Sequence, residues 1–173
     1  MKHILPIITI TTLAAAASAQ TAAAPSGLSY NRVTVARQGQ NTTLSASAFL
    51  GSSNVLATIS TGDNYNTGTS YALGYVFKGV GAGIDATVSV GNGNKDANST
   101  IGLNLRRSLS EVVSGLEIAV GVDYNSGAGA TASTKVYTYE LAYNINKQFS
   151  VAYGITDAAV GANLKTVSVR YNF

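Results

Sequence analysis

Apolar and polar residues alternate along most of this 173-residue chain. The last segment is the clearest case, because Val167, Val169, Tyr171 and Phe173 are separated by single polar residues. A period of two is typical of a β-strand with one apolar face, since successive side chains point to opposite faces of a sheet. No segment after residue 19 shows a sustained helical period. The alternation therefore predicts an all-β fold.

Ten segments carry this alternation. The expected strands are residues 28–37, 42–50, 54–62, 71–77, 84–90, 101–106, 116–124, 136–145, 149–156 and 166–173. The first three are less regular, and a bulge near Asn31 would account for the change of phase in the first. A tilted strand that crosses a bilayer needs about 9–11 residues, which is close to the length of most of these segments. We expect a closed antiparallel up-and-down transmembrane β-barrel of about ten strands, with eight as the alternative if two segments are loops.

The connections between the segments predict an orientation. Outer-membrane barrels have long outer loops and short periplasmic turns. The odd connections are residues 38–41, 63–68, 92–99, 125–133 and 157–163, and the even ones are 51–53, 78–81, 108–112 and 146–148. Apart from the first, the odd connections are the longer ones. We therefore expect them outside the cell, with both chain termini in the periplasm.

Alternation alone fits both a soluble, lipocalin-like barrel with an apolar interior and a membrane barrel with an apolar exterior. Here the second face consists mostly of Ser, Thr, Gly, Ala and Asn, which would form almost no core in a soluble barrel. In lipid, a closed barrel pairs its backbone groups and turns the apolar face to hydrocarbon. Aromatic residues near strand ends indicate two rings of aromatic side chains, one at each membrane–water interface. The alternative is that these residues reflect only the general preference of aromatic side chains for β-strands. They are Tyr71, Tyr124 and Tyr137 at the outer rim, and Phe77, Tyr143, Phe149, Tyr171 and Phe173 at the periplasmic rim.

Residues 1–19 have the pattern of a secretory signal peptide. Lys2 and His3 precede an apolar run at residues 4–13, and Ala17-Ser18-Ala19 has the form of a cleavage site. The apolar run is short for a membrane span, which disfavours the alternative of an N-terminal anchor. We expect a signal peptide at 1–19, a periplasmic lead at 20–27 and the barrel at 28–173. This arrangement predicts the bacterial outer membrane as the location.

Composition excludes several kinds of chemistry. The chain has no Cys, and its one His, His3, would leave with the signal peptide. A His-dependent catalytic triad and the usual His-containing metal sites are then excluded. Loss of Lys2 with the signal peptide would lower the formal net charge from the +3 of the full chain by one, which leaves too small a charge to indicate nucleic-acid binding. We expect no enzymatic activity and no cofactor or metal.

Several charged residues fall on the face expected to line the interior. They are Arg32, Asp85, Arg106, Glu117, Asp123, Glu140 and Arg170. Folding the successive hairpins places Asp85 opposite Arg106, Glu117 diagonal to Arg106, and Glu140 near Glu117. Closure of the barrel brings Arg170 beside Arg32. All of them except Asp123 form a mixed-sign group in the periplasmic half, which we name the charge belt.

The charge belt has three interpretations. A plug of salt bridges is favoured, because the belt contains both arginines and carboxylates, which would pair with one another. A selectivity constriction is the alternative, since the many small interior residues leave room for water. Glu117 and Glu140 also form a carboxylate pair of the kind found in glycosidases, which is disfavoured because arginines lie close to both.

Two parts of the chain carry a family resemblance. Residues 165–173 resemble the carboxy-terminal signal of outer-membrane barrels, which has alternating apolar residues and ends in Phe. The opening Leu28-Ser29-Tyr30-Asn31-Arg32-Val33, with the glycine-punctuated hairpins that follow, is similar to small opacity-type, porin-like outer-membrane barrels. The resemblance implies that the barrel-assembly machinery recognises Val167, Val169, Tyr171 and Phe173, and that lipid and periplasmic chaperones are the other partners. It implies a location rather than an activity.

Two functions fit these expectations. The first is a monomeric outer-membrane barrel, either structural or acting as a narrow porin-like passive pore with a charged lumen. The second is a surface adhesion or interaction barrel that binds a partner through its outer loops. Those loops are short and have few aromatic anchors, Tyr65 being the exception, which disfavours the second function.

Deletion of Phe173 tests the expected assembly signal. We expect a smaller fraction of folded, heat-modifiable protein in outer membranes, because the terminal aromatic residue is part of the alternating pattern that the resemblance assigns to recognition. Gel mobility with and without heating measures this fraction. An unchanged folded fraction and yield would mean that the terminus does not act as an assembly signal.

Overall fold

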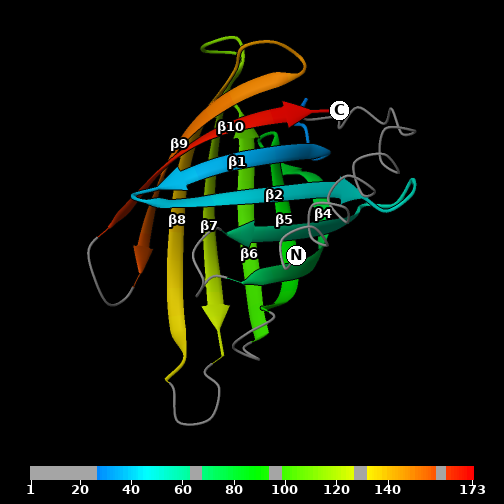
Figure 1. Ribbon diagram of the computed structural model, residues 1–173. Coiled ribbons are helices and arrows are strands. Elements are labelled where there is room, and N and C mark those ends of the chain that lie inside the picture. Colours follow the sequence, from blue (N-terminus) through cyan, green and yellow to red (C-terminus); the bar gives the residue numbers. More distant parts are fainter. Residues whose placement is uncertain (1–26, 63–67, 94–98, 127–131, 159–162) are drawn as a thin grey trace.

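The protein forms one sheet of ten antiparallel strands that closes on itself (Figure 1). The computed structural model describes residues 27–62, 68–93, 99–126, 132–158 and 163–173. The strands are β1 (Arg32–Gln38), β2 (Asn41–Phe49), β3 (Val55–Gly62), β4 (Thr69–Gly81), β5 (Ile84–Gly93), β6 (Ser99–Ser108), β7 (Leu116–Asn125), β8 (Thr134–Asn144), β9 (Phe149–Ala158) and β10 (Leu164–Asn172). The expected closed up-and-down barrel of ten strands is confirmed, and the eight-strand alternative is wrong.

Pairing between the first and last strands closes the barrel. Every residue of β1 has a partner on β10, from Arg32 opposite Asn172 to Gln38 opposite Thr166. β1 begins and β10 ends at the same end of the barrel, which we name the terminal end; the opposite end is the far end. Within the described ranges, no helix has the length and apolar character needed to cross a membrane.

The outward face of β4 to β10 is apolar and exposed. Leu73 on β4 and Tyr139 on β8, for example, keep 52% and 49% of their surface exposed. Apart from the half-buried Phe173, the aromatic residues expected at the rims are exposed near both ends, and Phe149 and Tyr171 contact each other with ring centroids 5.3 Å apart. Tyr75, Tyr139 and Tyr153 are also exposed and lie between the ends. Aromatic residues are therefore not confined to the two expected girdles.

The start of the first strand differs from the expectation. β1 begins at Arg32, and its register with β2 and β10 runs without a bulge, so the strand expected from residue 28 with a bulge near Asn31 is wrong. Leu28 and Tyr30 are buried, with 3% and 4% of their surface exposed, and they pack against Val76, Phe49 and Leu56. Residues 28–31, which we name the N-terminal segment, therefore fold into the barrel interior, because burial against inward side chains outweighs strand pairing.

Two of the turns at the terminal end also differ. The turn expected at residues 78–81 lies further along, because β4 continues to Gly81 with a register shift after Phe77. Ala82 and Gly83 make the turn with φ angles of 47° and 71°, the positive values that a type I′ hairpin requires. The connection between β6 and β7 spans residues 109–115 rather than 108–112. The lengths of the connections therefore distinguish the two ends less sharply than expected, and the orientation stays a prediction.

Candidate functional site in the barrel interior

The expected strand register of the charge belt agrees with the structure. Asp85 on β5 lies opposite Arg106 on β6, and Glu117 on β7 is two positions from the partner of Arg106. Glu140 on β8 is likewise diagonal to Glu117. Asp85, Arg106, Glu117 and Arg170 are buried, whereas Arg32 and Glu140 are half-buried. The six residues come from six strands and lie in the terminal half of the barrel.

Arg106 and Glu117 form a buried ion pair. Nη2 of Arg106 donates to Oε2 of Glu117 at 2.9 Å, and the two side chains are only 6% and 7% exposed. The second oxygen of Glu117 accepts a hydrogen bond of 2.6 Å from Nδ2 of Asn144. Nη1 of Arg106 donates to the carbonyl oxygen of Ser29 at 2.9 Å. The pair therefore links β6, β7 and β8 to the N-terminal segment.

Arg170 and Glu140 form a second ion pair, in which Nη2 of Arg170 donates to Oε2 of Glu140. β9 lies between the strands that carry them. The inward positions of β9 at this level are Ser150 and Ala152, both buried and small. Their size lets the arginine side chain extend over β9 to reach the carboxylate.

Asp85 is bonded to the N-terminal segment. The hydroxyl of Tyr30 donates to Oδ2 of Asp85 at 2.9 Å, and the backbone N–H of Gly79 donates to Oδ1 at 2.9 Å. Sequence reasoning placed Asp85 correctly but missed Tyr30, which is 55 residues away. The one sequence signal for Tyr30 was the change of phase at Asn31, which was interpreted as a bulge.

Other contacts hold the N-terminal segment in place. The guanidinium carbon of Arg106 lies 4.7 Å from the centroid of the Tyr30 ring, within the range of a cation–π interaction. The hydroxyl of Ser47 donates to the Tyr30 carbonyl at 2.7 Å, and the N–H of Phe49 donates to Oδ1 of Asn31 at 3.0 Å. The N–H of Phe173 donates to the carbonyl of Asn31 at 3.1 Å. The segment is thus bonded to β2, β5, β6 and the carboxyl terminus.

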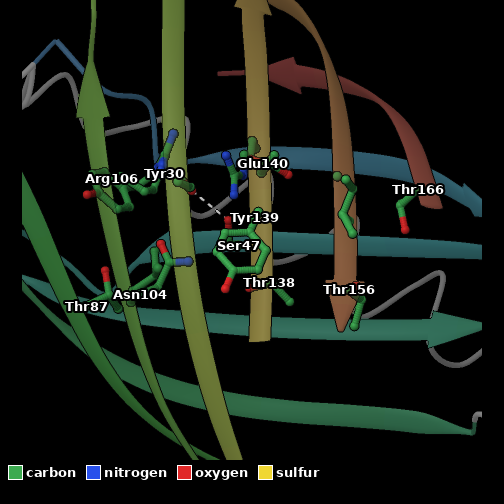
Figure 2. A pocket seen from close by; sticks show the side chains of 15 residues that line it. Tyr30, Ser47, Thr87, Asn104, Arg106, Thr138, Tyr139, Glu140, Thr156 and Thr166 are labelled. Atoms are coloured by element: carbon green, nitrogen blue, oxygen red, sulfur yellow. Dashed lines mark hydrogen bonds between the residues drawn. The ribbon is translucent and has the colours of Figure 1, made fainter. Parts of the chain in front are cut away.

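A cavity of about 350 Å³ adjoins the charge belt on the side of the far end. Figure 2 shows Arg106, Tyr30 and Glu140 at one level across the barrel, and Thr87, Asn104, Thr138 and Thr156 at the next level. A second cavity of about 330 Å³ is lined partly by Asp123. Asp123 thus lies apart from the charge belt, as expected. We name the first cavity the vestibule.

In the described part of the chain, the pair Glu117 and Glu140 is not arranged for glycoside hydrolysis. Glu117 and Glu140 each bind an arginine side chain through a carboxylate oxygen. A glycosidase needs one carboxyl group as a free general acid beside the other. Among the described residues, neither of these two carboxylates occupies that role.

The other predicted site was the carboxy-terminal pattern. Val167, Val169 and Tyr171 point outward from β10 and are exposed, while Phe173 is half-buried beyond the end of the strand. Their recognition by assembly machinery stays a prediction.

The barrel is similar in fold to a porin of known structure. The NanC porin matches with a TM-score of 0.52 over 82% of this chain and 98% of that chain, at 10% sequence identity. No family model matches the sequence, and no curated protein matches it either. At this identity the likeness concerns the porin-like barrel architecture, because one fold hosts many functions. The expected likeness to opacity-type barrels stays an expectation.

Replacement of Arg106 by Ala tests the buried ion pair. The change leaves Glu117 and the Ser29 carbonyl without their donor, and breaking a buried pair from one side costs about 3–5 kcal/mol. We expect a clear fall in the urea midpoint of the folded barrel in detergent. Arg107→Ala is the matched control, because its pair with Glu111 is 38% and 51% exposed and such surface pairs contribute about 0–1 kcal/mol. Equal midpoints for the two variants would contradict the burial of Arg106.

Proposed function

We propose that the protein is a small outer-membrane β-barrel of porin-like architecture whose interior is closed at the periplasmic end. The charge belt and the N-terminal segment together form the closure. The single observation that carries the proposal is the position of Tyr30, which is bonded to Asp85 and lies against Arg106 inside the barrel. The protein is then a plugged barrel that does not conduct freely in this conformation.

The outward surface supports placement in a lipid bilayer. Large apolar side chains are exposed along seven consecutive strands, β4 to β10. Water does not tolerate an apolar surface of this extent on a soluble monomer. A closed barrel also satisfies the strand hydrogen bonds that hydrocarbon could not satisfy. Lipid is therefore the solvent that fits this surface.

Closure is favoured over a working constriction by the burial of the charges. A selectivity constriction needs charged groups that border an open water path. Arg106, Glu117 and Arg170 are instead almost fully covered, and Val76 and Asp85 have no exposed surface. Four of the five outer loops expected to bind a partner in the alternative contain residues 63–67, 94–98, 127–131 and 159–162, which lie outside the described residues.

Cysteine labelling tests the location and the orientation. The chain has no Cys, so single substitutions at Ala132 and Lys147 give unambiguous sites, and both positions are exposed at opposite ends of the barrel. We expect an impermeant maleimide to label Ala132→Cys on whole cells, and Lys147→Cys only after the cells are opened. Equal labelling of both variants on whole cells, or the reverse order, would refute the orientation.

Planar-bilayer conductance tests the closure. We expect wild-type protein to conduct weakly, and Tyr30→Ala to conduct several-fold more, because the change removes the ring that packs between Arg106 and Phe49. Tyr30→Phe is the matched control: it keeps the ring and loses only the hydrogen bond to Asp85, so its conductance should stay near that of wild type. A wild-type conductance as large as that of Tyr30→Ala would show that the segment does not close the barrel.

A further inference from the structure

Asp123 on β7 carries a charge that the interior does not balance. In the charge belt, three arginines face three carboxylates, so the belt as a whole is neutral. Asp123 lies apart from the belt and lines the second cavity of about 330 Å³, which we name the outer cavity. Among the described residues, Asp123 forms no ion pair. The described interior therefore has one excess negative charge, and that charge lies in the outer cavity.

Within the described ranges, Asp123 is also the one charged residue that faces the interior in the far half of the barrel. Its partners in the strand register are the small Gly102 on β6 and the apolar Val136 on β8. The other charged residues described in that half lie on the outward faces of their strands. They are Arg37, Lys135, Asp157 and Lys165. The lining of the outer cavity contains no Lys or Arg, so none of these cations offsets Asp123 there.

Gly102 makes room for two oxygen atoms at this place. Its partner on β7 is Asp123, and its partner on β5 is Ser89. A methyl group on Gly102 would lie only 2.5 Å from Oδ1 of Asp123 and 2.7 Å from Oγ of Ser89. The carboxylate and the hydroxyl therefore face the same space above the backbone of Gly102.

The rest of the outer cavity offers neutral hydrogen-bonding groups. The hydroxyls of Ser60 and Ser70 lie on its opposite wall, 2.6 Å apart, and Thr87, Asn92 and Thr100 also line it. Each of these groups has an oxygen that can accept a hydrogen bond. The cavity thus combines one carboxylate with several neutral acceptors.

This combination favours an organic ammonium group over a metal ion. No group of three or more His, Cys, Asp and Glu residues in the described part of the chain is placed to hold a metal. Ca²⁺ takes about 6–8 oxygen ligands, among which carboxylates are prominent, whereas the outer cavity has a single carboxylate. A primary ammonium has three N–H donors and no acceptor, so one donor can bind the carboxylate and the others can bind hydroxyl oxygens.

We propose that the outer cavity binds a compact organic cation, a primary ammonium flanked by hydroxyl groups, with its ammonium on Asp123. The ammonium lies over Gly102, where Oδ1 of Asp123 and Oγ of Ser89 face the same space. The hydroxyl groups of the ligand bind the polar side chains of the wall. The site requires only the folded barrel, and it does not depend on which end of the barrel faces the outside of the cell.

A titration followed by amide chemical shifts of the isotope-labelled barrel in detergent tests the proposal, with 2-amino-1,3-propanediol as the probe. Glycerol is the matched neutral compound, because a hydroxyl replaces the ammonium. Isopropylammonium is the matched cation, because methyl groups replace the hydroxymethyl groups. We expect the probe to bind at least about fivefold more tightly than either, since charge-assisted hydrogen bonds are the stronger kind. The largest shifts should fall on Ser89, Gly102 and Asp123.

Asp123→Asn tests the charge with little change of shape. We expect it to lower the affinity for the probe to that for glycerol. Asp157→Asn is the matched control, because Asp157 is exposed on the outward face of β9 and should leave the affinity unchanged.

Gly102→Ala tests the space above the glycine while it keeps the charge. We expect a clear loss of affinity, because the added methyl group displaces the two oxygens. Gly154→Ala is the matched control: the nearest atom to its added methyl group is the Tyr139 carbonyl oxygen, at 3.4 Å. Heat-modifiable mobility shows that each variant is folded, and Asp123→Asn decides the matter if Gly102→Ala does not fold.

Three outcomes would overturn the site. They are the absence of shifts in wild type at tens of millimolar probe, equal affinities for the probe and glycerol, and equal affinities of Asp123→Asn and Asp157→Asn. An affinity for isopropylammonium equal to that for the probe would overturn the role of the hydroxyl groups. The titration is made in detergent and measures no current, so its failure is distinguishable from a failure of the proposed location or closure.

Discussion

Pairing of β1 with β10 is the contact on which the rest of this structure depends. The seven residue pairs from Arg32 and Asn172 to Gln38 and Thr166 join the two ends of the sheet and leave no unpaired strand edge. Once the sheet is closed, each strand residue must face either the interior or the outside, because side chains alternate along a strand. The apolar exterior and the polar interior are two consequences of the same closure.

Closure also explains why the charged residues pair as they do. A residue that faces a narrow interior must find its partner there, since the barrel wall separates it from solvent. Arg106 and Glu117 meet across one strand pair, whereas Arg170 must cross β9 to reach Glu140. The small residues of β9 make that crossing feasible. Arg32 lies on β1, next to the strand that carries Arg170, and its side chain forms no ion pair among the described residues.

The N-terminal segment fills part of the polar interior, and its contacts carry the proposed closure. Tyr30 supplies both an apolar ring, which packs with Phe49, and a hydroxyl, which donates to Asp85. A ring alone would leave Asp85 without that donor, and buried polar groups are costly when they lack partners. The same side chain therefore fills space and satisfies a charge. This combination favours one conformation of residues 28–31.

Sequence reasoning was accurate where periodicity is strong. The alternation from β4 to β10 predicted the strands, the exposed apolar face and the opposition of Asp85 and Arg106, because each hairpin relates neighbouring strands by a short connection. Sequence reasoning was wrong where strand-like alternation is outweighed by tertiary packing or by irregular strand pairing. Leu28 and Tyr30 alternate like strand residues, and only the packing of Val76 and Phe49 shows that they turn inward. Likewise, the irregular pairing after Phe77 moved the turn to Ala82 and Gly83.

The sequence by itself determined that this chain forms a closed barrel with an apolar outside. The reason is that alternation with a period of two shows which residues lie on the same face of the sheet. It also predicted which charges face the interior. Only the tertiary structure decided which of those charges bind each other and that the hydroxyl of Tyr30 donates to Asp85. The physical reason is that these contacts join residues far apart in the chain. Their distances depend on how the barrel closes and on which side chains then lie between the two residues, and the sequence around either residue does not specify this.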